Sequence, residues 1–111
     1  MGLALSPDTP AEAAFPLADA GALDLLLVMT VAPGFGGQAF QSRCLPKVRA
    51  LRQRYPLLDI QVDGGLTADT VGAAAAAGAN VIVAGSYVFG APDAAAAIAV
   101  LRAAVVAAQA L

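Results

Sequence analysis

The chain has 111 residues, of which 59% are hydrophobic and only 13% charged, and its formal net charge is −2. This length suits one small domain, and this composition excludes an intrinsically disordered chain. The small negative charge provides no basic field for nucleic acid or an anionic membrane surface, so we expect neither as a partner. The uncharged stretches 25–42 and 70–92 are interrupted by glycines and a proline, and we therefore expect no membrane span.

The cysteine content and the first residues bear on the compartment. Cys44 is the single cysteine, so an internal disulfide is excluded, which fits a reducing compartment. Residues 1–7 lack the cationic region of a secretory signal. The opening MGLALS formally fits a myristoylation pattern, but residues 2–5 suit a buried strand better. We expect a cytoplasmic protein, or a plastid one in a photosynthetic eukaryote.

Four short apolar runs predict strands, at residues 2–5, 24–31, 58–62 and 80–85. A helix-like stretch follows each run. Continuous apolar strands that alternate with helices are typical of a parallel sheet covered by helices. The sequence therefore predicts an α/β fold of four strand–helix repeats. Such repeats form either an open sheet or a closed barrel, and a closed barrel needs eight of them.

The four expected helices carry different signals. The first has a start signal at residues 9–12, with Thr9 as the expected cap. In the second, at 39–54, apolar residues recur at helical spacing. Five of the chain's six basic residues lie on the remaining faces of this helix, which we interpret as solvated rather than as a binding patch. Thr67 is expected to cap the third, alanine-rich helix, and the last begins near Pro92.

Each predicted strand ends in a glycine-rich or polar turn: SPDTP, APGFGGQ, DGG and GSYVFG. In parallel α/β proteins ligands bind at the carboxyl ends of the strands, so these turns are expected to share one rim. The glycines of 34–37 and the pair Gly85 and Ser86 are candidates for a phosphate cradle, because exposed backbone N–H groups bind anions. The alternative is that these glycines only make tight turns. The sequence contains neither GxxxxGK[ST] nor GxGxxG, the nucleotide-binding patterns.

Asp63 ends the third apolar run and precedes Gly64 and Gly65, so its carboxylate is expected to face the rim. A carboxylate in that position can ligate a metal or transfer a proton. It can equally cap the turn or the next helix through a side-chain hydrogen bond, and the residues alone leave both interpretations open. Met29, at the end of the second run, is expected to pack, although its adaptable side chain also suits the floor of a pocket.

Four blocks of the sequence carry a resemblance to a known family: MTVAPGFGGQAF (29–40), LPKVRALR (45–52), LDIQVDGGL (58–66) and GANVIVAGSYVFG (78–90). Together they resemble the ribulose-phosphate 3-epimerase family, and the resemblance runs from about residue 2 to about residue 107. The family fold is a (β/α)₈ TIM barrel. The resemblance thus implies that residues 1–111 form a single partial domain, the second half of such a barrel. The activity it implies is that of an isomerase of the pentose phosphate pathway.

That reaction is the reversible inversion at C3 of a ketopentose 5-phosphate, between D-ribulose 5-phosphate and D-xylulose 5-phosphate. By resemblance, Asp63 is both a metal ligand and one of two acid–base aspartates that work on opposite faces of C3. The implied cofactor is a divalent metal, zinc or iron and otherwise manganese or cobalt, which stabilises the enediolate. The residues implied to contact substrate or phosphate are Met29, Gly34, Phe35, Gly36, Gly37, Gly64, Gly65, Gly85 and Ser86.

The chain departs from the family pattern in what it lacks. The family binds its metal with two histidines and two aspartates, and this sequence contains no histidine. The second catalytic aspartate belongs to the first half of the barrel. We therefore expect an epimerase fragment that is inactive alone and that self-associates or pairs with an N-terminal half-barrel. The alternative is a non-catalytic, phosphate-binding half-barrel that needs a partner half or is vestigial.

Overall fold

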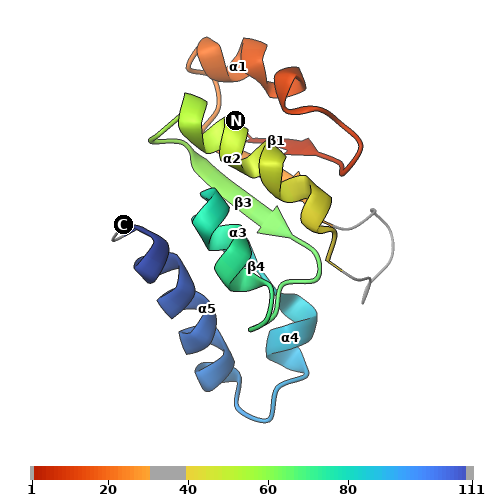
Figure 1. The fold of residues 1–111 in the computed structure, drawn as a ribbon, viewed down its shortest axis with the longest axis vertical. Coiled ribbons are helices and arrows are strands. Elements are labelled where there is room, and N and C mark those ends of the chain that lie inside the picture. The colour runs from red at the N-terminus through yellow and green to blue at the C-terminus, as the bar shows by residue number, and fades with distance from the viewer. Residues whose placement is uncertain (1, 31–39, 110–111) are drawn as a thin grey trace.

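The computed structural model describes residues 2–30 and 40–109 of the chain (Figure 1). The elements are β1 (Gly2–Leu5), η1 (Ala11–Ala14), α1 (Phe15–Asp19), β2 (Leu25–Met29), η2 (Ser42–Cys44), α2 (Leu45–Arg54), β3 (Asp59–Asp63), α3 (Val71–Ala77), β4 (Val81–Val83), α4 (Gly85–Phe89) and α5 (Ala94–Gln109). Each predicted strand is present, with ends within two residues of those expected. The elements η1 and η2 are short 3₁₀ helices that lead into α1 and α2.

The four strands form one parallel sheet in the order β1-β2-β3-β4. Neighbours in the sheet are thus neighbours in the sequence, as expected for successive strand–helix repeats with short connections. This confirms the predicted α/β fold. The outer edges of the described sheet are β1 and β4.

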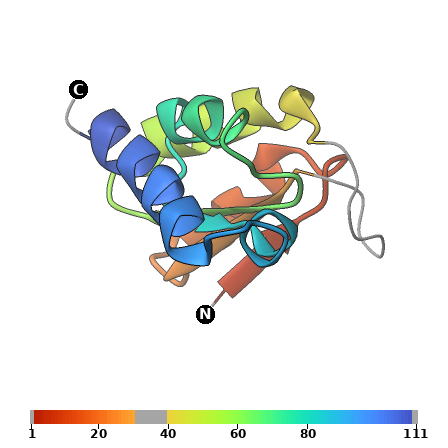
Figure 2. The same cartoon turned by 90° about the horizontal axis from the view of Figure 1, so that it is seen from below.

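The two faces of the sheet differ in burial because side chains alternate along a strand. Leu5, Leu26, Val28, Ile60 and Val62 are buried and share one face through the strand register. Helices α2 and α3 cover that face (Figure 2) and complete the core with Val48, Leu51 and Ala74. The opposite face carries the half-buried apolar side chains Leu25, Leu27, Met29, Val81 and Val83. No described side chain on this second face is buried.

Two predicted helix caps, Thr9 and Thr67, do not immediately precede the helices that they were expected to cap. Pro10, not Thr9, precedes the first helical turn, and it provides no side-chain cap. The Thr9 hydroxyl lies 2.8 Å from that of Ser6 instead, because Ser6 to Thr9 form a hydrogen-bonded turn. Helix α3 begins at Val71, and Thr67 forms the turn before it. Both threonines therefore stabilise turns rather than helix ends.

Four basic residues of η2 and α2 bind to their own chain, so the prediction of a merely solvated face was incomplete. Lys47 Nζ donates to the carbonyls of Ser6 and Pro7, at 2.9 and 3.0 Å. Arg43 pairs with Asp8 through an ion pair of 2.9 Å. These contacts hold α2 to the turn that follows β1.

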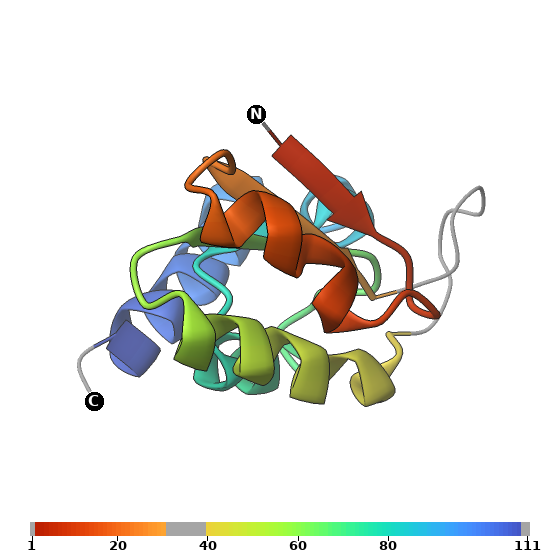
Figure 3. The same ribbon diagram turned by 90° about the horizontal axis from the view of Figure 1, so that it is seen from above.

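The far end of α2 is held against α1, which lies beside it (Figure 3). Arg54 Nη2 is 2.8 Å from Asp19 Oδ2, and the Tyr55 hydroxyl donates to Asp19 Oδ1 at 2.6 Å. The Arg54 guanidinium also lies 4.1 Å from the centroid of the Phe15 ring. None of the helices in the described part of the chain combines the length and the apolar character that crossing a membrane requires.

Candidate active-site rim

The carboxyl ends of three strands lie in one row. Met29 of β2 pairs with Asp63 of β3, and Asp63 pairs with Val83 of β4. Gly85 begins α4 two residues after Val83. Asp63 and the start of α4 are therefore at the same end of the sheet, as a shared rim requires. The predicted turn at GSYVFG is thus in part a short helix, which extends to Phe89.

Asp63 is half-buried at the end of β3. Its side chain lies on the sheet face that carries Met29 and Val83, away from the helix-covered core. Within residues 2–30 and 40–109, the Asp63 carboxylate accepts no hydrogen bond. The capping role that the sequence left open is therefore not realised within these ranges.

The turn after Asp63 is held by its carbonyl groups. Thr30 N donates to Asp63 O at 2.9 Å. The single hydroxyl hydrogen of Thr30 is shared between two carbonyl oxygens, Gly64 O at 2.5 Å and Asp63 O at 3.1 Å from Thr30 Oγ1. Thr70 Oγ1 donates to Gly65 O at 3.0 Å. Gly64 and Gly65 have φ values of 117° and 75°, which side-chain-bearing residues rarely adopt. The pair of glycines is thus required by the backbone of this turn.

Residues 34–37 lie outside the described part of the chain, and so does the side chain of Ser86. The residues that flank the segment 31–39 are described, however. Gln41 N donates to Thr30 O at 2.7 Å. Phe40 lies against the turn, where a Cβ atom on Gly65 would be 2.6 Å from Phe40 N. Thr30 and Phe40, the described residues on either side of 31–39, therefore both lie at the Asp63 turn.

Sequence reasoning missed Thr30, although the signal was present. It is the one hydroxyl-bearing residue within the apolar run 24–31, next to the end of that predicted strand. It is also fully buried, and no other polar side chain in the described residues is. A buried hydroxyl needs a hydrogen-bond partner, and the partners here come from a strand end 33 positions further along the chain.

The described residues do not form a metal site by themselves. No group of three or more His, Cys, Asp or Glu side chains is close enough together in these ranges to hold an ion. The whole sequence has no histidine. Asp63 is the one carboxylate at the row of strand ends, and a single carboxylate does not hold a divalent cation. A complete metal site would need ligands from outside the described chain.

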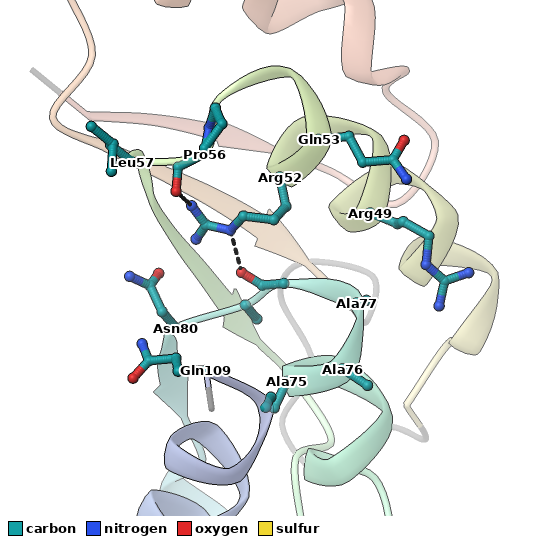
Figure 4. A pocket seen from close by; sticks show the side chains of 13 residues that line it. Arg49, Arg52, Gln53, Pro56, Leu57, Ala75, Ala76, Ala77, Asn80 and Gln109 are labelled. Carbon is teal, nitrogen blue, oxygen red and sulfur yellow. Dashed lines mark hydrogen bonds between the residues drawn. The ribbon is translucent and has the colours of Figure 1, made fainter. Parts of the chain in front are cut away.

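A hollow at the other end of the sheet contains an arginine whose hydrogen bonds hold the fold together. It lies where the end of α2, the end of α3 and the last turn of α5 meet, close to the start of β4 (Figure 4). The Arg52 guanidinium, which could attract an anion there, donates to the carbonyls of Gly78, Tyr55 and Pro56 at 2.9, 3.2 and 2.9 Å. Its donors therefore hold the chain ends of α2 and α3 together.

The parallel sheet, its helices and the rim at the strand ends define a protein of the α/β class, built from four strand–helix repeats. The chain belongs to the ribulose-phosphate 3-epimerase family, because the sequence model of that family matches residues 1–89. This confirms the family that the sequence blocks indicated.

Individual relatives agree with this assignment. The chain is 56% identical over 102 residues to the cytoplasmic isoform of ribulose-phosphate 3-epimerase from Oryza sativa subsp. japonica, covering 91% of this chain and 45% of the relative. It is 58% identical over 89 residues to ribulose-phosphate 3-epimerase from Schizosaccharomyces pombe, covering 80% and 38%. For the protein of that name from Mycobacterium tuberculosis H37Rv the identity is 45% over 105 residues, covering 91% and 45%.

The chain thus spans less than half the length of these curated relatives. A solved structure shows the same relationship. The crystal structure titled Amycolatopsis orientalis BexX/CysO complex contains a chain similar to this one, with a TM-score of 0.67 and 25% identity. The match covers 96% of this chain and 41% of that one. The four repeats therefore correspond to under half of the length of each of these proteins.

Proposed function

We propose that the chain is the second half of a ribulose-phosphate 3-epimerase, which interconverts D-ribulose 5-phosphate and D-xylulose 5-phosphate. The observation that carries this proposal is the row of strand ends that brings Asp63 to the same end of the sheet as the start of α4. Family membership supports it. Inversion at C3 needs a group that moves a proton beside a seat for the substrate phosphate, and this rim offers a place for both.

In this proposal Asp63 moves a proton on one face of C3. Its carboxylate is half-buried at the end of β3 and lies on the sheet face that points away from the helix-covered core. Met29, its partner in the strand register, lies beside the reacting part of the sugar. The residues proposed to contact the substrate or its phosphate are Gly34, Phe35, Gly36, Gly37, Gly64, Gly65, Gly85 and Ser86.

The proposed activity needs a second polypeptide half. The relatives are more than twice as long as the part that this chain matches, and one carboxylate cannot serve both faces of C3. The proposed partner is an N-terminal half-barrel, which would pair with the free edges of β1 and β4. The divalent metal of the proposed enzyme would take Asp63 as one ligand and its other ligands from that half. The name of the rice relative agrees with a cytoplasmic location.

Coexpression tests the proposal. The chain is produced alone and together with the N-terminal half of the rice relative, and epimerase activity is measured with divalent metal added. We expect activity only for the pair and its loss with Asp63→Asn. Asp59→Asn is the matched control, because Asp59 lies on the same strand and face but at the opposite end. Activity of the chain alone, or activity that persists in Asp63→Asn, would refute the assignment.

The second candidate function is a non-catalytic half-barrel that binds phosphate. It is favoured by the lack of histidine in the sequence and of a metal-binding cluster among the described side chains. Titration of the chain alone with ribulose 5-phosphate, followed by ³¹P NMR, separates the two functions. Binding without activity in any pairing would support the second candidate.

A further inference from the structure

The hydroxyl group of Thr30 lies against the main chain of the residue that carries the proposed acid–base carboxylate. Two donors of Thr30 reach this turn: its amide donates to Asp63 O, and the single hydrogen of its hydroxyl is shared between Gly64 O, the closer acceptor, and Asp63 O. Thr30 is fully buried, and no other described polar side chain is. A donor from one strand thus holds two successive carbonyls at the end of the next strand.

The placement of the hydroxyl matters because it lies on the other side of the sheet from the carboxylate. In the register of β2 and β3, Met29 is opposite Asp63, so Thr30 follows one position later and its side chain points into the core. The Asp63 side chain points to the uncovered face. Thr30 therefore restrains the Asp63 backbone from behind without touching the carboxylate or occupying the substrate side.

The turn needs such a restraint. Gly64 and Gly65, which follow Asp63, both have positive φ, and glycine has a wider choice of backbone conformations than any other residue. The direction of the Asp63 side chain is set by the orientation of the peptide groups on either side of it. Without a restraint, this orientation would change whenever the backbone of the turn rotates. Catalytic groups need to be held within about 0.5 Å of the productive geometry.

We propose that Thr30 is a positioning residue: its hydroxyl fixes the Asp63–Gly64 peptide and so sets the direction of the Asp63 carboxylate. The functional part of this inference rests on the proposed role of Asp63. The structural part does not, because it concerns the orientation of the turn in the chain itself.

The first test uses the isolated chain, labelled with ¹³C and ¹⁵N, and three variants. Thr30→Val keeps the shape but removes the donor, Thr30→Ser keeps the donor, and Val28→Ala is a destabilising control at a fully buried site in β2, two residues before Thr30. We expect Thr30→Val to shift the Asp63 carboxyl signal and the Gly64 and Gly65 amide signals, Thr30→Ser to restore them, and Val28→Ala to leave them in place. A merely structural role predicts the same response from Thr30→Val and Val28→Ala.

A second measurement needs no variant and covers the case in which Thr30→Val does not fold. The Thr30 hydroxyl proton of the wild-type chain should exchange with water at least about tenfold more slowly than that of the half-exposed Thr9, because it is buried and bonded. Equal exchange rates would overturn the proposal. So would unchanged turn signals in a folded Thr30→Val chain.

The last test adds catalysis and keeps the two proposals separate. In the assembled pair of halves described above, Thr30→Val should lower kcat by roughly 10- to 100-fold with little change in KM, because a misdirected group loses rate rather than substrate binding. Thr30→Ser should recover most of the rate. If Asp63→Asn is fully active, the proposed function fails while the NMR result still decides the role of Thr30 in the turn. If Asp63→Asn is inactive and Thr30→Val is unimpaired, the positioning role alone fails.

Discussion

Gly65 and Phe40 approach each other so closely that the turn after β3 has no room for a side chain. A Cβ atom on Gly65 would lie 2.6 Å from Phe40 N and 2.8 Å from Phe40 Cα, in a backbone conformation with a φ of 75°. Gly65→Ala therefore meets both strain and a clash with backbone atoms. We expect it to lower the free energy of unfolding by about 2–4 kcal/mol, measured by urea titration.

Gly72→Ala is the control for this substitution. Gly72 lies exposed in α3, and apart from its chain neighbours and the nearby backbone of its own helix, no described atom is within 4 Å of the position that its Cβ would take. Alanine there should raise the free energy of unfolding by about 0.5–1 kcal/mol, since it only improves helix propensity. Similar effects of the two substitutions would contradict the close approach at Gly65.

The contact between α1 and α2 should make the stability of the chain depend on pH. The hydrogen bond from Arg54, followed by that from Tyr55, lowers the pKa of Asp19. A carboxyl group whose pKa is lower in the folded state stabilises the fold above its unfolded pKa of about 4, and this stabilisation is lost as the pH falls through the folded value. We expect wild type to be more stable than Asp19→Asn at pH 6 and the difference to vanish near pH 2, in urea titrations across that range.

Asp69→Asn is the control for the loss of folding stability between pH 6 and pH 2. Asp69 is exposed, and no described basic side chain forms an ion pair with it. A difference between wild type and Asp19→Asn that stays constant from pH 6 to pH 2 would show that the ion pair is not the cause.

Cys44 should be unreactive in the folded chain. The residue is fully buried, and burial is the main cause that raises the pKa of its thiol. Both effects lower the concentration of accessible thiolate, the reactive form. We expect Ellman's reagent to modify the native chain at least about 100-fold more slowly than the chain in urea. In the Cys44→Ser chain, Ser42→Cys places the thiol at an exposed position two residues away and should react at once. Rapid modification of native Cys44 would contradict its burial.

The uncovered face of the sheet should cause the isolated chain to self-associate. This face carries Leu25, Leu27, Met29, Val81 and Val83, and none of these is buried. Leu27→Lys places a charge in the middle of the row, and we expect it to shift the chain toward monomer in size-exclusion chromatography with light scattering. Leu57→Lys changes a 97% exposed leucine outside this face and should have a smaller effect. A wild-type chain that stays monomeric up to millimolar concentration would refute the prediction.

Helix starts were harder to predict than strands. Each strand is a run of apolar residues of the right length, and the pattern alone identifies it. Thr9 and Thr67 also fit a local pattern, that of a helix cap, but both hydroxyls are used in the turns before the helices. The same residue types are favoured in helix caps and in turns, so the local sequence does not distinguish a cap from a turn.

The same contrast, between what local sequence patterns identify and what they do not, holds for the candidate site and its surroundings. Asp63 could be named from the sequence because it ends an apolar run and precedes two glycines, and the glycines are required by their positive φ values. The sequence pattern predicts that the basic side chains of α2 are solvated, because a local pattern does not reveal partners that lie far away in the chain. Arg54 meets Asp19 across 35 positions, and Lys47 meets Ser6 across 41.

The sequence by itself determined the strand–helix order, the parallel sheet, the family and the residue that carries the candidate carboxylate, because each of these depends on local patterns or on blocks of neighbouring residues. Only the tertiary structure decided that Thr30 holds the turn after Asp63, that Phe40 closes against Gly65, and that one face of the described sheet carries no buried side chain. These relationships depend on the register between strands and on packing between distant segments. They exist only once the chain has folded.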